Sequence, residues 1–132
     1  MSAASLRCMA AAMLLASASL AAEAATWQQL LKGTPFEMFN ETDMKMFLEA
    51  SHKALDVAPL NDIVIWSNPD TKAGGDLTAV SQFKGMVQSQ ERECKLVRVR
   101  VQAKGRNTNT NVNVCQIDGK WTLVPRSDLK KK

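Results

Sequence analysis

The sequence has few of the residues on which most catalytic and metal sites depend. It contains one histidine, His52, and three cysteines among 132 residues. No second cysteine pair exists to complete a zinc site, and no partners for a catalytic triad with His52 can be named. A Gly-rich phosphate loop and a nucleophile motif are also missing. We therefore expect a non-catalytic protein with no cofactor and no metal, and we interpret His52 as a half-exposed residue at a helix edge.

Two further sets of acidic residues are weak candidates for a site. Glu91 and Glu93 could mimic a pair of catalytic carboxylates, but basic residues flank them, which favours a solvated charge cluster. Oxygen-bearing side chains also gather between Asn68 and Asp76, where calcium is an alternative. That segment lacks the alternating acidic spacing of a calcium loop, and Lys72 stands where a ligand is needed. Asn, Pro, Asp and Gly most often form turns, so we predict a turn there.

Long apolar runs are confined to the beginning of the chain. Arg7 precedes an apolar stretch from Cys8 to Ala22, which is followed by the small-x-small pattern Ala22-Glu23-Ala24. This arrangement is typical of a signal peptide cut after Ala24, which would remove Cys8 as well. The stretch is shorter than the roughly twenty residues that a membrane-spanning helix needs, although a membrane anchor is the alternative. We expect residues 1–24 to be a signal peptide, no transmembrane segment in the mature chain, and a protein exported to the periplasm or associated with the outer membrane.

Cys94 and Cys115 remain after the expected cleavage. In an oxidising compartment an even pair of cysteines is first interpreted as a disulfide, with two free thiols as the alternative. Their spacing excludes a Cys-x-x-Cys redox motif. We predict a structural disulfide between them.

Charge is distributed unevenly along the chain. Residues 33–76 contain eight acidic and three basic side chains, whereas residues 77–132 contain four acidic and twelve basic ones. A basic half favours anionic partners. Export, and the lack of aromatic residues between the basic ones, argue against nucleic acid. The expected partner is an anionic component of the envelope or an envelope protein.

The periodicity of apolar residues changes near Pro59. Asn40 and Asp43 resemble a capping box, and apolar residues then recur at helical spacing, which predicts a helix from Glu41 to Leu55. Beyond Pro59 the pattern is that of strands, at residues 62–67 and again at residues 77–83, with a turn between them.

The segment from residue 92 to residue 124 predicts two hairpins. A turn between Lys104 and Gly105 pairs residues whose numbers sum to 209, so Val97 faces Val112 and Cys94 lies opposite Cys115. A second turn at residues 118–119 adds another strand. One face of this sheet is apolar and can receive the helix, while the other carries the disulfide, arginines and asparagines. We predict an α+β fold with one principal α-helix packed on an antiparallel sheet of four or five strands.

The polar face of the sheet is the candidate binding surface. Arg98 and Arg100 are expected beside Asn109 and Asn111 on the neighbouring strand. Guanidinium groups suit carboxylates and phosphates, and asparagine amides add neutral donors. This predicts an anion-binding site, with an ordinary solvated strand face as the alternative.

Several short motifs together resemble the C-terminal domain of the bacterial 17 kDa-type outer-membrane surface antigens. They are Asn40-Glu41-Thr42-Asp43, Ala54-Leu55, Ala58-Pro59, Trp66-Ser67-Asn68-Pro69-Asp70-Thr71, Gly75, Cys94-Lys95, Cys115 and Asp118-Gly119-Lys120-Trp121. The lipidated cysteine and glycine-rich segment with which such antigens often begin have no counterpart, and Lys72 and Gln116 replace the usual Gly and Arg.

The resemblance implies an envelope protein with no assigned catalytic residues and no known cofactor. We expect a short N-terminal segment at 25–36, a surface-antigen-like α+β domain at 37–125 and a basic tail at 126–132. The predicted function is that of a small disulfide-stapled binding or accessory domain. The alternatives are a passive structural surface antigen domain and a binder of anionic polymers through the basic sheet face.

Overall fold

The computed structural model describes residues 26–29 and 31–131. The expected signal peptide, including Cys8, lies outside these residues. Residues 26–29 are helical. The 3₁₀ helix η1 (Pro35–Met38) precedes the principal helix α2 (Glu41–His52), which continues as the π-helical turn η2 (Lys53–Val57). No helix in this described part is long and apolar enough to cross a membrane.

Helix α2 begins where the sequence predicts. The Asn40 side chain accepts a hydrogen bond of 2.7 Å from the Asp43 amide, and Asp43 Oδ2 accepts one of 3.0 Å from the Asn40 amide. This capping box satisfies two of the backbone donors that a helix start leaves open. Met44, Phe47 and Leu48 are buried on one face of the helix, as their spacing predicts.

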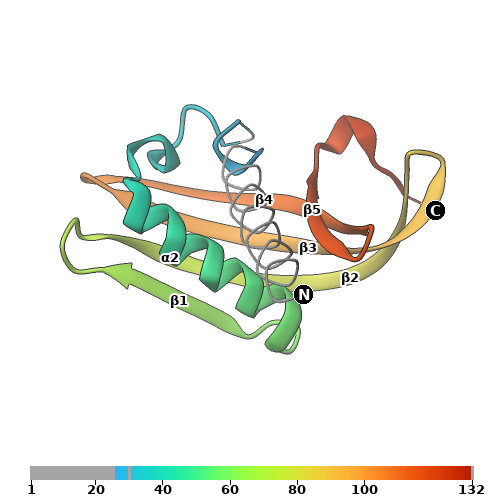
Figure 1. Cartoon of the computed structure of the whole chain (residues 1–132), viewed down its shortest axis with the longest axis horizontal. Coiled ribbons are helices and arrows are strands. Elements are labelled where there is room, and N and C mark those ends of the chain that lie inside the picture. Colours follow the sequence, from blue (N-terminus) through green and yellow to red (C-terminus); the bar gives the residue numbers. More distant parts are fainter. Residues whose placement is uncertain (1–25, 30, 132) are drawn as a thin grey trace, which may run out of the picture.

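The sheet is antiparallel with the strand order β1-β2-β3-β4-β5. Its strands are β1 (Ile63–Asn68), β2 (Ala73–Val87), β3 (Gln90–Ala103), β4 (Arg106–Ile117) and β5 (Lys120–Val124). Helix α2 lies across one face of it (Figure 1). The predicted α+β fold, with one helix on a five-stranded sheet, is therefore confirmed.

The register of the first predicted hairpin is also confirmed, and the second predicted turn, at residues 118–119, joins β4 to the antiparallel β5. Val97 pairs with Val112, and Cys94 pairs with Cys115, around the turn at Lys104 and Gly105. The β2–β3 hairpin was not predicted. Its turn residues Gln88 and Ser89 have φ angles of 54° and 61°, a conformation that usually attracts Gly, Asn or Asp.

The main hydrophobic core lies between α2 and the sheet. Phe36 and Phe47 are fully buried there, with ring centroids 4.7 Å apart and nearly perpendicular ring planes. Phe47 also approaches Trp27 edge-on at 4.9 Å. Val97 and Val99 fill the sheet side of this core. The face of β3 and β4 that turns away from α2 is therefore available for other contacts.

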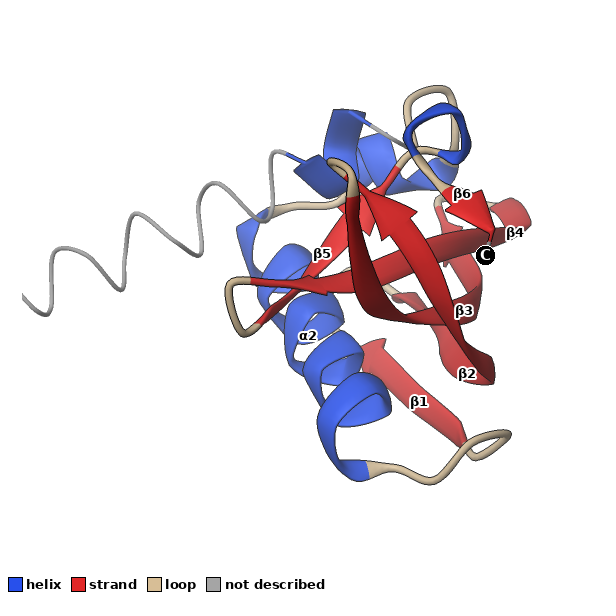
Figure 2. Cartoon of the chain, turned by 90° about the vertical axis from the view of Figure 1, so that its right-hand side faces the viewer, coloured by secondary structure: helices blue, strands red, loops and turns tan. Residues whose placement is uncertain are grey.

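A second, smaller core lies on the opposite face, at the other end of the sheet. It contains the disulfide and Val87 and Val124, with Leu129 packed against them. The chain reaches this position because residues 126–131, expected as a basic tail, fold back as the 3₁₀ helix η3 (Arg126–Asp128) and the short strand β6 (Lys130–Lys131), which pairs with β2. Figure 2 shows β6 on the side of the sheet away from α2.

Candidate functional site

The four residues of the predicted anion site lie together on the sheet face opposite α2. Arg98 pairs with Asn111, and Arg100 pairs with Asn109, across β3 and β4. Val97, Val99 and Val101 alternate with the two arginines and are buried on the helix side. We call Arg98, Arg100, Asn109 and Asn111 the arginine face.

The register of the remaining strands extends the arginine face into two cross-strand rows. Each row contains one residue from each of β1, β2, β3 and β4. The first row is Ile65, Asp76, Arg100 and Asn109, and the second is Ile63, Thr78, Arg98 and Asn111. Across each row, an exposed isoleucine is therefore followed by a polar residue, an arginine and an asparagine.

The guanidinium groups of Arg98 and Arg100 have no ionic partner among the described residues. Arg100 is exposed and Arg98 is half-buried. Asp76 lies opposite Arg100 in the register, yet no ion pair joins their side chains. With one carboxylate against two guanidinium groups, the two rows keep a net positive charge.

Three buried polar atoms on these rows have no hydrogen-bond partner in the described structure. They are the Arg98 Nε, the Thr78 Oγ1 and an Asp76 carboxylate oxygen, and Thr78 is only 2% exposed. Buried polar groups almost always have partners in native proteins, so three such atoms on two neighbouring strands are unusual. The Arg98 N–H and the Thr78 hydroxyl can both donate.

Sequence reasoning missed the two isoleucines of these rows. Ile63 and Ile65 are 56% and 77% exposed, although they lie in an apolar strand. A fold of the chain between Asp70 and Thr71 places Ile65 opposite Asp76, but the residues of this turn do not by themselves specify that centre. The Asn-Pro-Asp-Thr segment was interpreted only as a turn, without a register.

The segment beginning at Asn68, for which calcium binding was the alternative, forms hydrogen bonds with the start of α2. Asp43 Oδ1 accepts hydrogen bonds from the Asn68 side-chain amide at 2.8 Å and from the Thr71 hydroxyl at 2.7 Å. Burial raises the pKa of Asp43, but the bonds from Thr71, the Asn40 amide and Asn68 outweigh it and leave the pKa below the ordinary 3.8. No group of three or more His, Cys, Asp or Glu side chains that could hold a metal occurs within residues 26–29 and 31–131.

The remaining acidic and histidine candidates lie in ordinary charge contacts. Glu91 and Glu93 are 3.7 and 3.8 Å from the Lys84 ammonium group, on exposed strand positions. His52 lies 3.9 Å from Asp56, one helical turn further on, and both side chains are half exposed.

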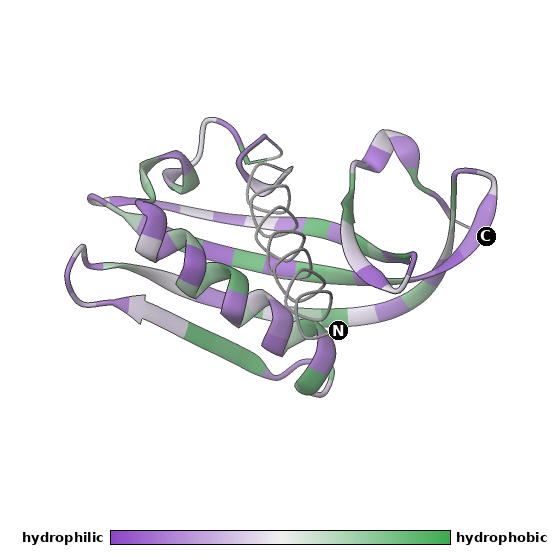
Figure 3. Cartoon of the chain, in the orientation of Figure 1, coloured by the Kyte–Doolittle hydropathy of each residue, from purple (hydrophilic) through white to green (hydrophobic). Residues whose placement is uncertain are grey.

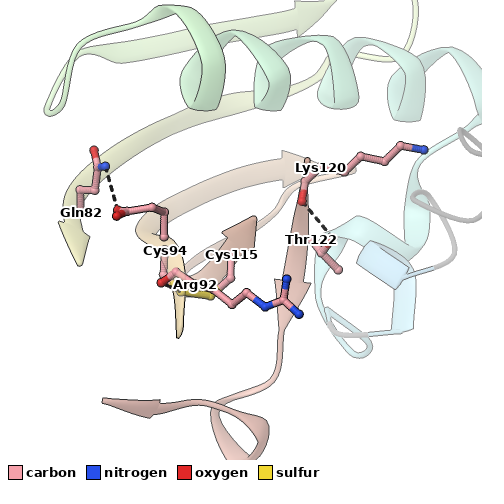
Figure 4. The surroundings of a disulfide bond; sticks show 7 residues. Gln82, Arg92, Cys94, Cys115, Lys120 and Thr122 are labelled. Atoms are coloured by element: carbon pink, nitrogen blue, oxygen red, sulfur yellow. Dashed lines mark hydrogen bonds between the residues drawn. A yellow bond between two sulfur atoms is a disulfide. The ribbon is translucent and has the colours of Figure 1, made fainter. Parts of the chain in front are cut away.

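Cys94 and Cys115 form the predicted disulfide. The bridge lies on the same sheet face as the arginines, as expected, but neither cysteine is exposed. Figure 4 shows the bridge between Cys94 and Cys115, with the side chain of Gln82 to one side of it. The Gln82 amide donates a hydrogen bond of 3.3 Å to the Glu93 carboxylate. A Cβ atom added at Gly85 would lie 2.5 Å from Leu129 and 3.2 Å from the Cys94 sulfur, so the glycine leaves room for the leucine over the bridge.

A groove of about 1240 Å³ follows the same sheet face between the arginine face and the C-terminal segment. Leu96 and Phe83 line it from the sheet, Leu129 lines it from the C-terminal segment, and Asn111 is among its polar lining residues. Asn111 therefore belongs to both the arginine face and the groove.

Comparison with known proteins gives no match: no family model, no curated protein and no solved structure is similar to this chain.

Proposed function

We propose that this protein is a non-catalytic, exported domain of the bacterial cell envelope that binds an anionic group on its arginine face. The observation that carries the proposal is the pair of guanidinium groups, without ionic partners among the described residues, that lie on one face of β3 beside two asparagine amides of β4. Arg100 is exposed and Arg98 is half-buried, so an anion in solvent can reach the guanidinium groups of both. A phosphate or carboxylate would satisfy these donors through charge-assisted hydrogen bonds.

The wider setting supports the envelope part of the proposal. The apolar stretch before Ala24 has the length and ending of a signal peptide, and a buried disulfide suits an oxidising compartment. The short motifs that resemble the 17 kDa-type surface antigens fit the same location. We propose a place in the periplasm or at the outer membrane.

Retention on a defined polyanion tests the binding role. The wild-type protein and an Arg98→Ala/Arg100→Ala variant are passed over immobilised dextran sulfate at low salt. The wild type should be retained and released by added salt, whereas the variant should pass through with an unchanged melting temperature. An Arg106→Ala/Lys120→Ala variant is the matched control, because it removes two exposed positive charges away from the rows.

The control separates a specific face from general positive charge. Weaker retention of both variants to the same extent would mean that net charge alone is responsible. Equal retention of all three proteins would leave the second candidate, a passive structural surface domain.

A further inference from the structure

Of the large apolar side chains that are exposed in the described structure, two lie on the edge strand β1 and two precede it in η2 and the following loop. They are Val57, Leu60, Ile63 and Ile65. Strand β1 contains no charged residue and no proline, and its edge away from β2 has no paired strand among the described residues. Figure 3 shows the first half of β1 as a hydrophobic stretch at the margin of the sheet. Natural edge strands usually carry charges, proline or a cover, so this edge lacks the usual protection.

The isoleucines share their two rows with the arginines. Ile65 and Arg100 belong to one row and are separated by a single strand, as are Ile63 and Arg98 in the other row. Neighbouring strands lie about 4.8 Å apart, so each isoleucine is roughly 10 Å from its arginine across the sheet. Side chains on one face of a sheet point in the same direction, so one flat partner can contact both pairs.

We propose that the partner of the arginine face is the surface of an anionic phospholipid membrane, with Ile63 and Ile65 entering the boundary between headgroups and acyl chains. This inference rests on the proposed function, since the arginines bind the lipid phosphates. A soluble polyanion would occupy the arginines and leave both isoleucines in water. A lipid surface offers phosphates and methylene groups side by side, which matches the order of residues along each row.

The position of Asp76 sets the strength of this binding. Its carboxylate lies between Ile65 and Arg100 in the first row and opposes negative lipid charge. Two arginines against one aspartate leave a single net charge, and two isoleucines bury little apolar area. The protein therefore binds such membranes reversibly and in a salt-sensitive way.

Cosedimentation of the purified protein with lipid vesicles tests the inference. One set of vesicles contains phosphatidylglycerol mixed with phosphatidylcholine, and the other contains phosphatidylcholine alone. Wild type should bind the anionic vesicles better than the neutral ones by roughly fivefold, as about 1 kcal/mol for one net positive charge near the surface implies. Both Arg98→Ala/Arg100→Ala and Ile63→Thr/Ile65→Thr should lose most of that binding.

The isoleucine variant separates the two proposals. It should still bind dextran sulfate as wild type does, because it keeps both arginines, and threonine keeps the β-branched shape that suits a strand. The matched control is Val57→Thr/Leu60→Thr, which removes exposed apolar groups outside the rows and should bind anionic vesicles like wild type. The melting temperature of each variant verifies that it is folded.

The remaining outcomes show which of the two proposals is wrong. The lipid inference is wrong if the isoleucine variant binds anionic vesicles like wild type. It is also wrong if the Val57→Thr/Leu60→Thr control loses as much binding as the isoleucine variant. In both cases the proposed binding of anions is unaffected. If the arginine variant binds both dextran sulfate and anionic vesicles like wild type, the proposed function and the lipid inference are both wrong. If wild type sediments as a dimer that the isoleucine substitutions dissociate, and does not bind vesicles, β1 is covered by a second copy of the chain instead.

Discussion

The side-chain amide of Asn68 donates a hydrogen bond of 2.8 Å to Asp43 Oδ1, which connects the end of β1 to the first turn of α2. The same carboxylate caps its own helix through the Asn40 amide and accepts a bond from the Thr71 hydroxyl. One buried aspartate thus fixes the helix against the edge of the sheet from which Ile63 and Ile65 project. The Asn-Pro-Asp-Thr segment has a structural role here.

Replacing Asp43 with alanine should destabilise the fold strongly. The substitution leaves the Asn68 amide, the Thr71 hydroxyl and the Asn40 amide without their acceptor, and Asp43 is only 1% exposed. Losing several bonds to a charged group should lower the free energy of unfolding by about 3 kcal/mol, measured by urea denaturation. Asp70→Ala is the control, because it removes an exposed carboxylate from the same loop and should change stability by less than about 0.5 kcal/mol. Similar losses in the two variants would contradict the central role of Asp43.

Stability should also depend on the ionisation of Asp43 in acid. The pKa of Asp43 in the folded protein lies below its ordinary value of 3.8. Its charged form therefore stabilises the fold fully above that ordinary value, and this contribution is lost as the pH falls through the lower folded pKa. Asp43→Asn, which cannot ionise, should show a shallower loss of stability below pH 3.8 than wild type does. Urea midpoints measured across this acid range would decide, and parallel curves for the two proteins would refute the assignment.

The parts of the fold that sequence reasoning predicted are those with a local signal. Gly105 and Gly119 occupy turn positions with φ of 77°, which suit glycine, and the valines of β3 and β4 alternate cleanly around the first of them. Those two features alone determine the register that pairs Cys94 with Cys115. The capping residues Asn40 and Asp43 determine the start of α2 in the same local way.

The parts that were missed depend on contacts without a local signal. The β2–β3 turn uses Gln88 and Ser89, neither of which is a preferred residue for positive φ. Leu129 covers the disulfide. Its neighbours in the sequence are mostly charged, and they predicted a solvated tail. The two rows require the β1–β2 register, and a turn of several residues around Pro69 does not specify one. The arginine face was predicted because β3 and β4 are joined by a tight hairpin.

Removing the disulfide should lower thermal stability clearly. The bridge joins residues separated by 21 positions, for which the chain-entropy estimate is roughly 3 kcal/mol. For a domain of this size the melting temperature of a Cys94→Ser/Cys115→Ser variant should fall by about ten degrees or more. Calorimetry under oxidising conditions would measure the difference. Two alkylatable thiols in the native wild-type protein, together with an unchanged melting curve, would show that no structural bridge forms.

Gly75 should tolerate no side chain. A Cβ atom at this position would collide with the backbone carbonyl oxygen of Arg100 on the neighbouring strand. Gly75→Ala should therefore separate β2 from β3 and lower the free energy of unfolding by about 3 kcal/mol or more. Gly105→Ala is the matched control, because Gly105 has a positive φ but no atom within 4 Å of the added Cβ. Its cost should be limited to backbone strain, about 1–2 kcal/mol. Equal losses in both variants would mean that the close approach of the strands does not matter.

Leu129 should protect the disulfide from reductant. Its side chain packs over the bridge beside Gly85, where a β-carbon would lie 2.5 Å from the leucine methyl group. Leu129→Ala removes this cover. It should lower the free energy of unfolding by about 2 kcal/mol, at the low end for leucine because this residue is only partly buried. The more specific effect is on the rate of disulfide reduction. Dithiothreitol should reduce the bridge several times faster in the variant, because the sulfur atoms become accessible to the attacking thiolate. The rates are compared at a temperature where both proteins remain folded. Lys130→Ala is the control, since Lys130 is exposed and lies one residue further along the same segment. If Leu129→Ala and wild type are reduced at the same rate, reduction proceeds through global unfolding or another opening, and the C-terminal segment does not protect the bridge.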